Sequence, residues 1–191
     1  MSVTRRNYVL FGFLAAAILG SSTAALAQEG ASTGAYRFAL VQRDLDSAMR
    51  NEALDAEKYV LFARQARERG NHELAAVFER VADRERGAHL QALASLSARG
   101  MVIDQAEQQA ELAKLPARSD EANLRDAMRA ERFDANEMRS ELVNRALKYG
   151  DVEVAQTFLN VGQGEIKNLL EFRSALKQLK RSQKEGVARQ S

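Results

Sequence analysis

The chain has 191 residues, of which 46% are hydrophobic, and this is enough for one domain with a buried core and a short additional segment. Helix-forming residues dominate, and there is one proline and no tryptophan, which favours an all-α protein over a sheet protein. The 28 basic and 26 acidic residues give a formal charge of +2, with part of the excess in the two ends, so no nucleic-acid-binding surface is indicated. The absence of cysteine excludes disulfides, zinc ribbons and iron–sulfur centres.

The first 27 residues have the pattern of an export signal. Two arginines precede a short apolar stretch, and the small residues A-L-A precede Gln28 as a cleavage site. The apolar stretch is shorter than the ~20 residues that a membrane-spanning helix needs. The run T-R-R-N-Y-V-L resembles a twin-arginine signal, but Leu10 stands where a lysine is common, so ordinary secretion stays open. We expect a periplasmic or otherwise exported protein with no membrane anchor once residues 1–27 are removed.

Four segments of the remaining chain show apolar residues at steps of three and four, the spacing of one face of a helix. Each of these stripes contains one glutamate among apolar neighbours. The stripes are Leu45, Met49, Glu52, Ala56, Tyr59, Ala63 and Ala66; Leu74, Phe78, Val81, Glu85, Ala88 and Ala92; Leu124, Met128, Glu131, Ala135, Met138 and Leu142; and Val154, Phe158, Val161, Glu165, Asn168, Phe172, Ala175 and Leu179.

The four helices form two hairpins that resemble each other. F-E-R-V-A-D-R-E before and including Glu85 parallels F-L-N-V-G-Q-G-E before and including Glu165. Gly70 and Gly150 stand at equivalent places where a helix should end, and each is followed by a residue that can cap the next helix. Both turns are therefore short and both hairpins antiparallel.

The segment 97–123 is the long connection between the hairpins. It holds the only proline, Pro116, and Ser119 or Asp120 can cap the third helix, while residues 105–114 can form a short helix. Two helix hairpins joined by one long crossover make a ferritin-like antiparallel four-helix bundle. We assign it to residues 28–180, followed by a polar tail at 181–191.

Four glutamates inside the bundle core need compensating positive charge, because burying an unpaired carboxylate costs several kcal/mol. Two divalent cations would supply this charge. Asp134 follows Glu131 by three residues and shares its helix face. Oxygen ligands in a bundle favour iron or manganese. The alternative is that these acids lie at the edge of each stripe and pair with Arg84, Arg129 or Arg132.

The motifs resemble those of the rubrerythrins over about residues 45–175. E-A-L-D-A-E-K-Y is similar to the first-helix motif of that family, and this similarity implies that Glu52 is a terminal metal ligand and that Tyr59 donates to a ligand carboxylate. A plain core tyrosine is the alternative. The run A-A-V-F-E-R-V-A-D-R-E resembles the approach to the bridging glutamate, which falls on Glu85 and, in the fourth helix, on Glu165. E-R-F-D-A-N-E-M resembles the third-helix motif, with ligands at Glu131 and Asp134.

Two departures from the family pattern concern its histidine ligands. The family places a histidine three residues after each bridging glutamate, where this chain has Ala88 and Asn168. Asn168 keeps a carbonyl oxygen as a weak candidate ligand. His89 is a further candidate, although an α-helical turn would put it on the neighbouring face. We expect His72, just past the first turn, on the surface.

The resemblance implies an oxidoreductase with two iron or manganese ions that reduces peroxide or oxygen or oxidises ferrous ion in defence against oxidative stress. It also implies a possible homodimer. The family's rubredoxin domain is missing, since the chain has no cysteine, so an external electron donor would be needed. The alternatives are a protein that binds metal without turnover and a degenerate bundle that acts through protein contacts. Both alternatives are kept because Ala88 and Asn168 stand where the family has its histidine ligands.

Overall fold

The computed structural model describes residues 10–100 and 103–188, with side chains for residues 34–100, 103–185 and 188. It divides into two units, Met1–Leu40 and Val41–Ser191. The described part of the first unit is helical and belongs to α1 (Leu10–Glu68). The arginines of the predicted export signal lie outside the described residues, as do the side chains around its cleavage site. Within the described chain, no helix meets the length and hydropathy that crossing a membrane requires.

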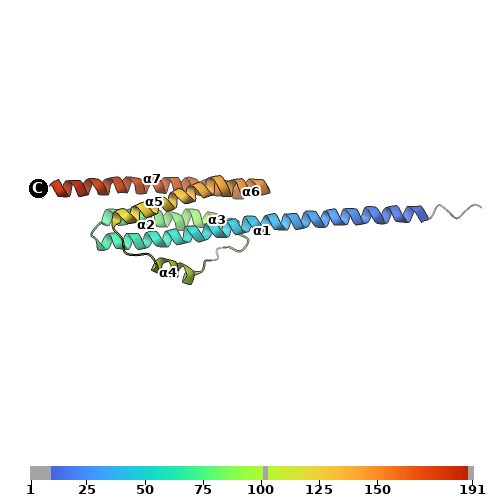
Figure 1. Ribbon diagram of the computed structural model, residues 1–191, viewed down its shortest axis with the longest axis horizontal. Coiled ribbons are helices and arrows are strands. Elements are labelled where there is room, and N and C mark those ends of the chain that lie inside the picture. The colour runs from blue at the N-terminus through green and yellow to red at the C-terminus, as the bar shows by residue number, and fades with distance from the viewer. Residues whose placement is uncertain (1–9, 101–102, 189–191) are drawn as a thin grey trace, which may run out of the picture. The chain divides into compact units, whose positions relative to one another are not determined.

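The second unit is a bundle of helices (Figure 1). After α1 come two long helical segments that each contain one π-helical turn, and then one uninterrupted helix. The elements are α2 (His72–Arg84), η1 (Glu85–His89) and α3 (Leu90–Leu96); α4 (Gln105–Ala113); α5 (Asp120–Asn136), η2 (Glu137–Leu142) and α6 (Val143–Tyr149); and α7 (Val152–Ala188). The two predicted hairpins and the crossover are confirmed. Helix α7 continues beyond residue 180, where the bundle was expected to end.

Both hairpin turns are made as the glycines predicted. Gly70 and Gly150 have φ of 79° and 82°, a left-handed conformation that favours glycine and ends a helix. Asn71 then caps α2 by accepting a hydrogen bond from the Leu74 amide, and Asp151 caps α7 in the same way. Each hairpin therefore reverses direction within a few residues, which sets its two helices side by side.

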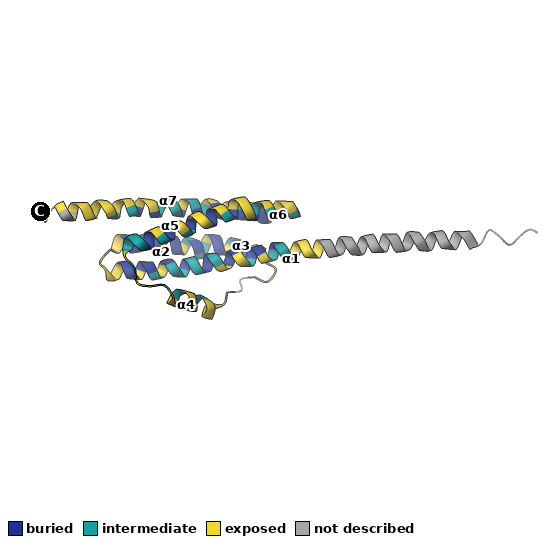
Figure 2. Cartoon of the chain, in the orientation of Figure 1, coloured by how far each residue is buried: buried dark blue, intermediate teal, exposed yellow. Residues whose placement is uncertain are grey.

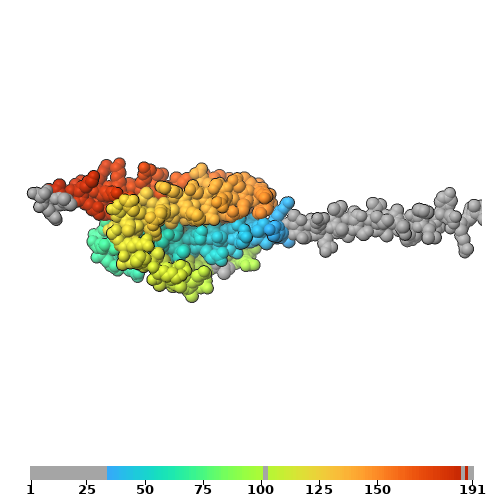
Figure 3. Space-filling view, viewed as in Figure 1, coloured from blue at the N-terminus to red at the C-terminus, as the bar shows by residue number. Residues whose placement is uncertain are grey.

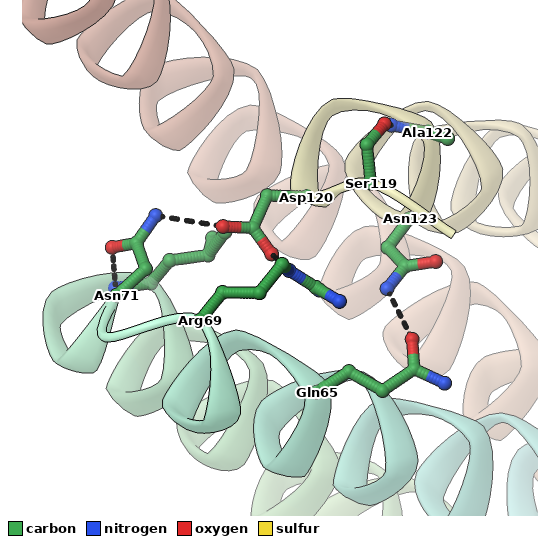
Figure 4. A network of polar contacts seen from close by, with 8 residues as sticks. Gln65, Arg69, Asn71, Ser119, Asp120, Ala122 and Asn123 are labelled. Carbon is green, nitrogen blue, oxygen red and sulfur yellow. Dashed lines mark hydrogen bonds and ion pairs between the residues drawn. The ribbon is translucent and has the colours of Figure 1, made fainter. Parts of the chain in front are cut away.

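Polar contacts join the first turn to the start of α5 (Figure 4). The Asp120 carboxylate accepts hydrogen bonds from Arg69 and from the Asn71 side chain. Deeper in the bundle, Asn123 donates to the Gln65 side chain at 2.8 Å, and both residues are buried. These bonds fix where α5 begins against α1, and Ser119 caps α5 through the Ala122 amide.

Helix α4 in the crossover matches the short helix expected there. Asp104 caps it by accepting from two amides, and none of its residues is buried. Its yellow-green atoms protrude from the surface of the bundle in the space-filling view (Figure 3). Helix α4 thus adds no buried residue to the bundle, whereas Ile103 just before it packs against the core.

The buried faces follow the predicted stripes closely (Figure 2), although Met128 and Leu179 are only partly buried and the stripe of the second helix is displaced. Ala88 was expected in the core but is exposed, and Ala92 is only partly buried. The cause is η1, in which the Leu90 amide bonds to the Glu85 carbonyl five residues back. The wider turn shifts the stripe by one residue, so that His89 and Leu93 take the buried places.

Candidate metal centre

A layer of acidic side chains divides the bundle core in two. One apolar cluster contains Met49, Met138 and Val161, and the other contains Tyr59, Phe78 and Phe172. The glutamate of each stripe lies between these clusters along its own helix, and all four are at most 3% exposed. They are Glu52, Glu85, Glu131 and Glu165. The hypothesis that these acids sit at the edge of the stripes is therefore wrong.

Three of these glutamates converge on one imidazole. The His89 Nδ1 atom lies 2.7 Å from Glu165 Oε1, 2.9 Å from Glu85 Oε2 and 3.2 Å from Glu52 Oε2. One donor atom from each of the four residues falls within 4.8 Å of every other. Two ligand atoms at right angles about an ion, each ~2.1 Å from it, lie about 3 Å apart. The spacing observed here therefore suits the ligand shell of a single metal ion.

His89 reaches this cluster for two structural reasons. The π turn η1 carries it from the neighbouring face, where an α-helix would leave it, onto the face of Glu85. On the other side, the imidazole lies directly against the backbone of Gly164, where any side chain would collide with the ring. Gly164 precedes Glu165, so the close approach of η1 to α7 also brings that carboxylate to His89.

Glu131 is the fourth glutamate of the layer and lies beside Glu165. Neither of its carboxylate oxygens has a hydrogen-bond partner of normal geometry among the described residues. Tyr59, also fully buried, is adjacent, and its hydroxyl likewise makes no hydrogen bond of normal geometry within the described chain. Burial and the nearby acids Asp55 and Glu131 raise the pKa of Tyr59. Buried polar atoms left without partners are typical of a site that another group completes.

Asp134 belongs to the layer but turns towards α1 and not into the group around His89. Its carboxyl group lies beside that of Asp55, whose side chain is 15% exposed and forms an ion pair with Lys58. Asp55 was not among the predicted site residues. It follows Glu52 by three residues, as Asp134 follows Glu131, so the resemblance between the two hairpins could have identified it.

Asp55 and Asp134 also line an open groove between α1 and α5, with a volume of about 370 Å³. The groove includes Lys58 and the exposed Phe133. It leads from the surface to the two aspartates, which are close enough to Glu85 and Glu165 to feel their charges. The acidic layer is thus approached from this side of the bundle.

The protonation of the layer follows from its burial. Burial raises the pKa of Glu52, Glu131 and Glu165, and for Glu52 the charge of Glu165 adds to the effect. Burial and the charge of Asp55 raise the pKa of Asp134 to about 8. Burial alone would lower the pKa of His89, but its hydrogen bonds to Glu165 and Glu85 raise it to about 10. Without a metal, the layer therefore holds protons at neutral pH.

The other residues singled out in the sequence are an asparagine, a second histidine and the arginines considered as partners of the acids. Asn168 is fully buried beside Glu85 and turns its amide nitrogen, not its oxygen, to that carboxylate. His72 is exposed, as predicted. Of the arginines considered as partners for the acids, Arg129 pairs with Asp126, and Arg84 reaches Asn168 and Glu171.

Comparisons with known proteins identify the fold and the family of the chain. The chain is similar in structure to symerythrin from Cyanophora paradoxa, reduced with dithionite, with a TM-score of 0.63 and 24% identity over 73% of this chain and 84% of that one. It is also similar to nigerythrin in a mixed-valent state, with a TM-score of 0.62 and 23% identity over 73% of this chain and 67% of that one. These likenesses confirm the ferritin-like fold. No curated protein matches. The sequence model of the Rubrerythrin family matches residues 44–176, most of the chain, and the protein therefore belongs to that family.

Proposed function

We propose that the acidic layer binds two metal ions, iron or manganese, and that the protein is a di-metal oxidoreductase acting on peroxide, dioxygen or ferrous ion. The observation that carries this proposal is the convergence of three buried glutamates on one imidazole, with the buried Glu131 beside Glu165, so that the residues come from four helices. Such ligand sets in bundle cores are typical of di-iron and di-manganese carboxylate proteins. Membership of the rubrerythrin family, whose members hold di-iron sites, supports the same conclusion.

The charges of the layer fit two divalent cations. Six carboxylates are involved when Asp55 and Asp134 are counted with the four glutamates. Among the described residues, Lys58 forms an ion pair with Asp55, while Arg84 contacts Asn168 and pairs with Glu171. Two divalent ions together with Lys58 would balance five of the six negative charges with His89 neutral, because Arg84 is already paired with Glu171. The partnerless oxygens of Glu131 would then be occupied.

The bound metals would supply the electrons, or accept them, in a two-electron step. The residues of the chain hold and shape the site. By the family resemblance, Glu85 and Glu165, at equivalent places in the two hairpins, would hold both ions, and Glu52 and Glu131 would each supply a further ligand. The groove between α1 and α5 gives small molecules a path to Asp55 and Asp134. Lys58 would attract anionic species to that path, and the apolar clusters on both sides exclude bulk water.

The second candidate is a protein that binds metal without turnover. It is favoured by the single imidazole, because both positions at which the family has histidines carry other residues, Ala88 and Asn168. Carboxylate ligands without imidazole hold iron less firmly and favour manganese. This candidate shares the metal site with the first and differs only in its reactivity.

Metal analysis and a peroxide assay on the same preparation separate the candidates. We expect about two iron or manganese ions per chain and peroxide consumption that depends on an added reductant. Two ions without peroxide, oxygen or ferrous ion turnover would support the second candidate. Protein that gains no metal from iron or manganese solutions would refute both. Glu131→Gln is the matched variant, because it removes one carboxylate while keeping the size of the side chain.

We also propose that the protein acts outside the cytoplasm and takes electrons from a separate donor. The first proposal rests on the export pattern of residues 1–27 and the second on the absence of cysteine. Mass analysis of protein from the periplasmic fraction tests the first proposal, since removal of the signal predicts a chain that starts near Gln28. A chain that still carries Met1 would contradict it.

A further inference from the structure

Asn168 occupies the place in α7 where the family has a histidine ligand, and its side-chain oxygen was a weak candidate ligand on the sequence alone. It is 0% exposed, and both ends of its amide are engaged. Its Nδ2 atom donates a short hydrogen bond to Glu85 Oε1, and its Oδ1 atom accepts one from Arg84. Glu85 is thereby held from two sides, since its other oxygen, Oε2, lies 2.9 Å from His89.

The orientation of this amide follows from its partners. A guanidinium group has N–H donors and no acceptor, so the side-chain oxygen of Asn168 must face Arg84. The reverse orientation would set N–H groups against the guanidinium and an oxygen against the Glu85 carboxylate. Both contacts would be repulsive, and the site is buried. Asn168 therefore presents a donor to the acidic layer and keeps its oxygen away from it.

Arg84 is itself held in place by a second acid. Its Nη2 atom lies 3.1 Å from Glu171 Oε2, and the other oxygen of Glu171 accepts from Arg80. Arg84 is 22% exposed, whereas Arg80 is 58% exposed and does not reach Asn168. A chain of contacts thus runs from Glu171 through Arg84 and Asn168 to Glu85.

We infer that Asn168 is a positioning residue that holds the bridging carboxylate of Glu85 by donation, with Arg84 fixing its amide, and that it is not a metal ligand. This inference rests on the proposed function for its meaning, but the contacts that carry it are all between residues of this chain. Each carboxylate oxygen can accept in two directions, so Glu85 Oε1 can take the Asn168 N–H and still bind a metal. The site is then asymmetric, with an imidazole from η1 and a hydrogen-bond donor from α7.

A metal-free measurement tests the contacts directly. In ¹⁵N–¹H spectra of the metal-free protein, we expect the Asn168 side-chain amide protons to exchange slowly with solvent, with the signal assigned by its loss in Asn168→Leu. Arg84→Met should speed this exchange, because it releases the amide oxygen, whereas Arg84→Lys retains a donor and should preserve the slow exchange. Arg80→Met is the matched control, since Arg80 shares Glu171 but not Asn168, and it should change nothing. Fast exchange in the native protein would overturn the inference.

Manganese binding tests the consequence, with Mn²⁺ alone as the probe and free ion measured by electron paramagnetic resonance. Loss of a partner that orients a ligand typically weakens binding about 10–100-fold, and we expect this for Asn168→Leu and Arg84→Met. Because both substitutions act through the same contact, their effects should not multiply. The double variant should bind Mn²⁺ at most about threefold more weakly than whichever single variant has the lower affinity. Arg84→Lys should restore most of the affinity.

The outcomes distinguish this inference from the proposed function. Native affinity in Asn168→Leu, or losses that multiply in the double variant, would overturn the inference. Native protein that binds no Mn²⁺ or Fe²⁺ would overturn the proposed metal site, and the amide exchange would still decide the role of Asn168. Circular dichroism confirms that each variant is folded before either measurement is interpreted.

Discussion

The substitution Asp134→Asn should stabilise the metal-free protein while it weakens metal binding. Asp134 is buried beside Asp55, and burial together with that charge raises its pKa from 3.8 to about 8. Between these pH values the folded chain holds a proton that the unfolded chain has lost. The contribution of Asp134 to stability is therefore complete below pH 3.8 and is lost as the pH rises towards 8. An asparagine does not titrate and avoids this loss.

The magnitude follows from the width of that interval. Each pH unit is worth about 1.4 kcal/mol for one proton, so at pH 7 the loss is at most about 4 kcal/mol. We expect the free energy of unfolding of metal-free Asp134→Asn to exceed that of the native chain by up to this amount at pH 7. The two proteins should be alike near pH 4. With metal bound the order should reverse, because the variant lacks one carboxylate oxygen ligand.

Urea unfolding at pH 4 and pH 7, with a chelator present, measures this difference. Asp126→Asn is the matched control, because Asp126 lies on the same helix and lines the same groove but pairs with Arg129. Its loss of a surface ion pair should cost about 0–1 kcal/mol at pH 7. If metal-free Asp134→Asn is less stable than the native chain at pH 7, Asp134 is not held protonated by its surroundings and the reasoning about the layer is wrong.

Three further predictions concern the ligands themselves. His89→Gln and Gly164→Ala should each weaken Mn²⁺ binding at least about tenfold, because His89→Gln removes the imidazole and Gly164→Ala displaces it. Unchanged affinity in both variants would exclude His89 as a ligand. Mn²⁺ affinity should rise between pH 6 and pH 8, by up to about tenfold per pH unit for each proton displaced, because His89 and Asp134, with pKa values of about 10 and 8, must lose protons to bind the ion. Calorimetry in buffers of different ionisation enthalpy counts these protons. An affinity that does not change with pH would contradict the assignment of these two residues as ligands. Ala88→His should leave Mn²⁺ affinity within about twofold of native, because residue 88 faces solvent; a clear gain would show that the second helix is regular at this point.

Much of the fold could be predicted because its signals are local. The stripes of α1, α5 and α7 keep α-helical spacing throughout the layer, so Glu52, Glu131 and Glu165 were identified from sequence steps alone. Gly70 and Gly150 marked both turns, because a left-handed residue at a helix end strongly favours glycine. The four glutamates also occupy equivalent places in two similar hairpins, which made the layer visible as a pattern.

The errors arose where one helix departs from regular geometry. Counting by threes and fours assumes α-helical turns, and the π turn η1 adds a residue without any clear mark in the sequence. Ala88 was therefore placed in the core and His89 beside it, the reverse of what the structure has. The contact between the His89 ring and Gly164 is a tertiary feature, since it depends on how closely two helices approach, and no local pattern encodes it.

Asp55 and Asn168 illustrate a different limit. Asp55 repeats the spacing of Asp134 within the first hairpin, so comparison of the two hairpins would have revealed it. The amide of Asn168 could be judged only as a weak ligand from its residue type. Its role depends on Arg84, which lies 84 residues away in the chain and meets it through packing of α2 on α7.

Anomalous diffraction from crystals of the protein grown with Mn²⁺ tests the central claim most directly. We expect two peaks about 3.5–4 Å apart inside the bundle, surrounded by the predicted ligands Glu52, Glu85, His89, Glu131, Asp134 and Glu165. In Glu131→Gln the occupancy of at least one peak should fall. A fully loaded crystal with no peak inside the bundle, or with peaks only on its surface, would contradict the account.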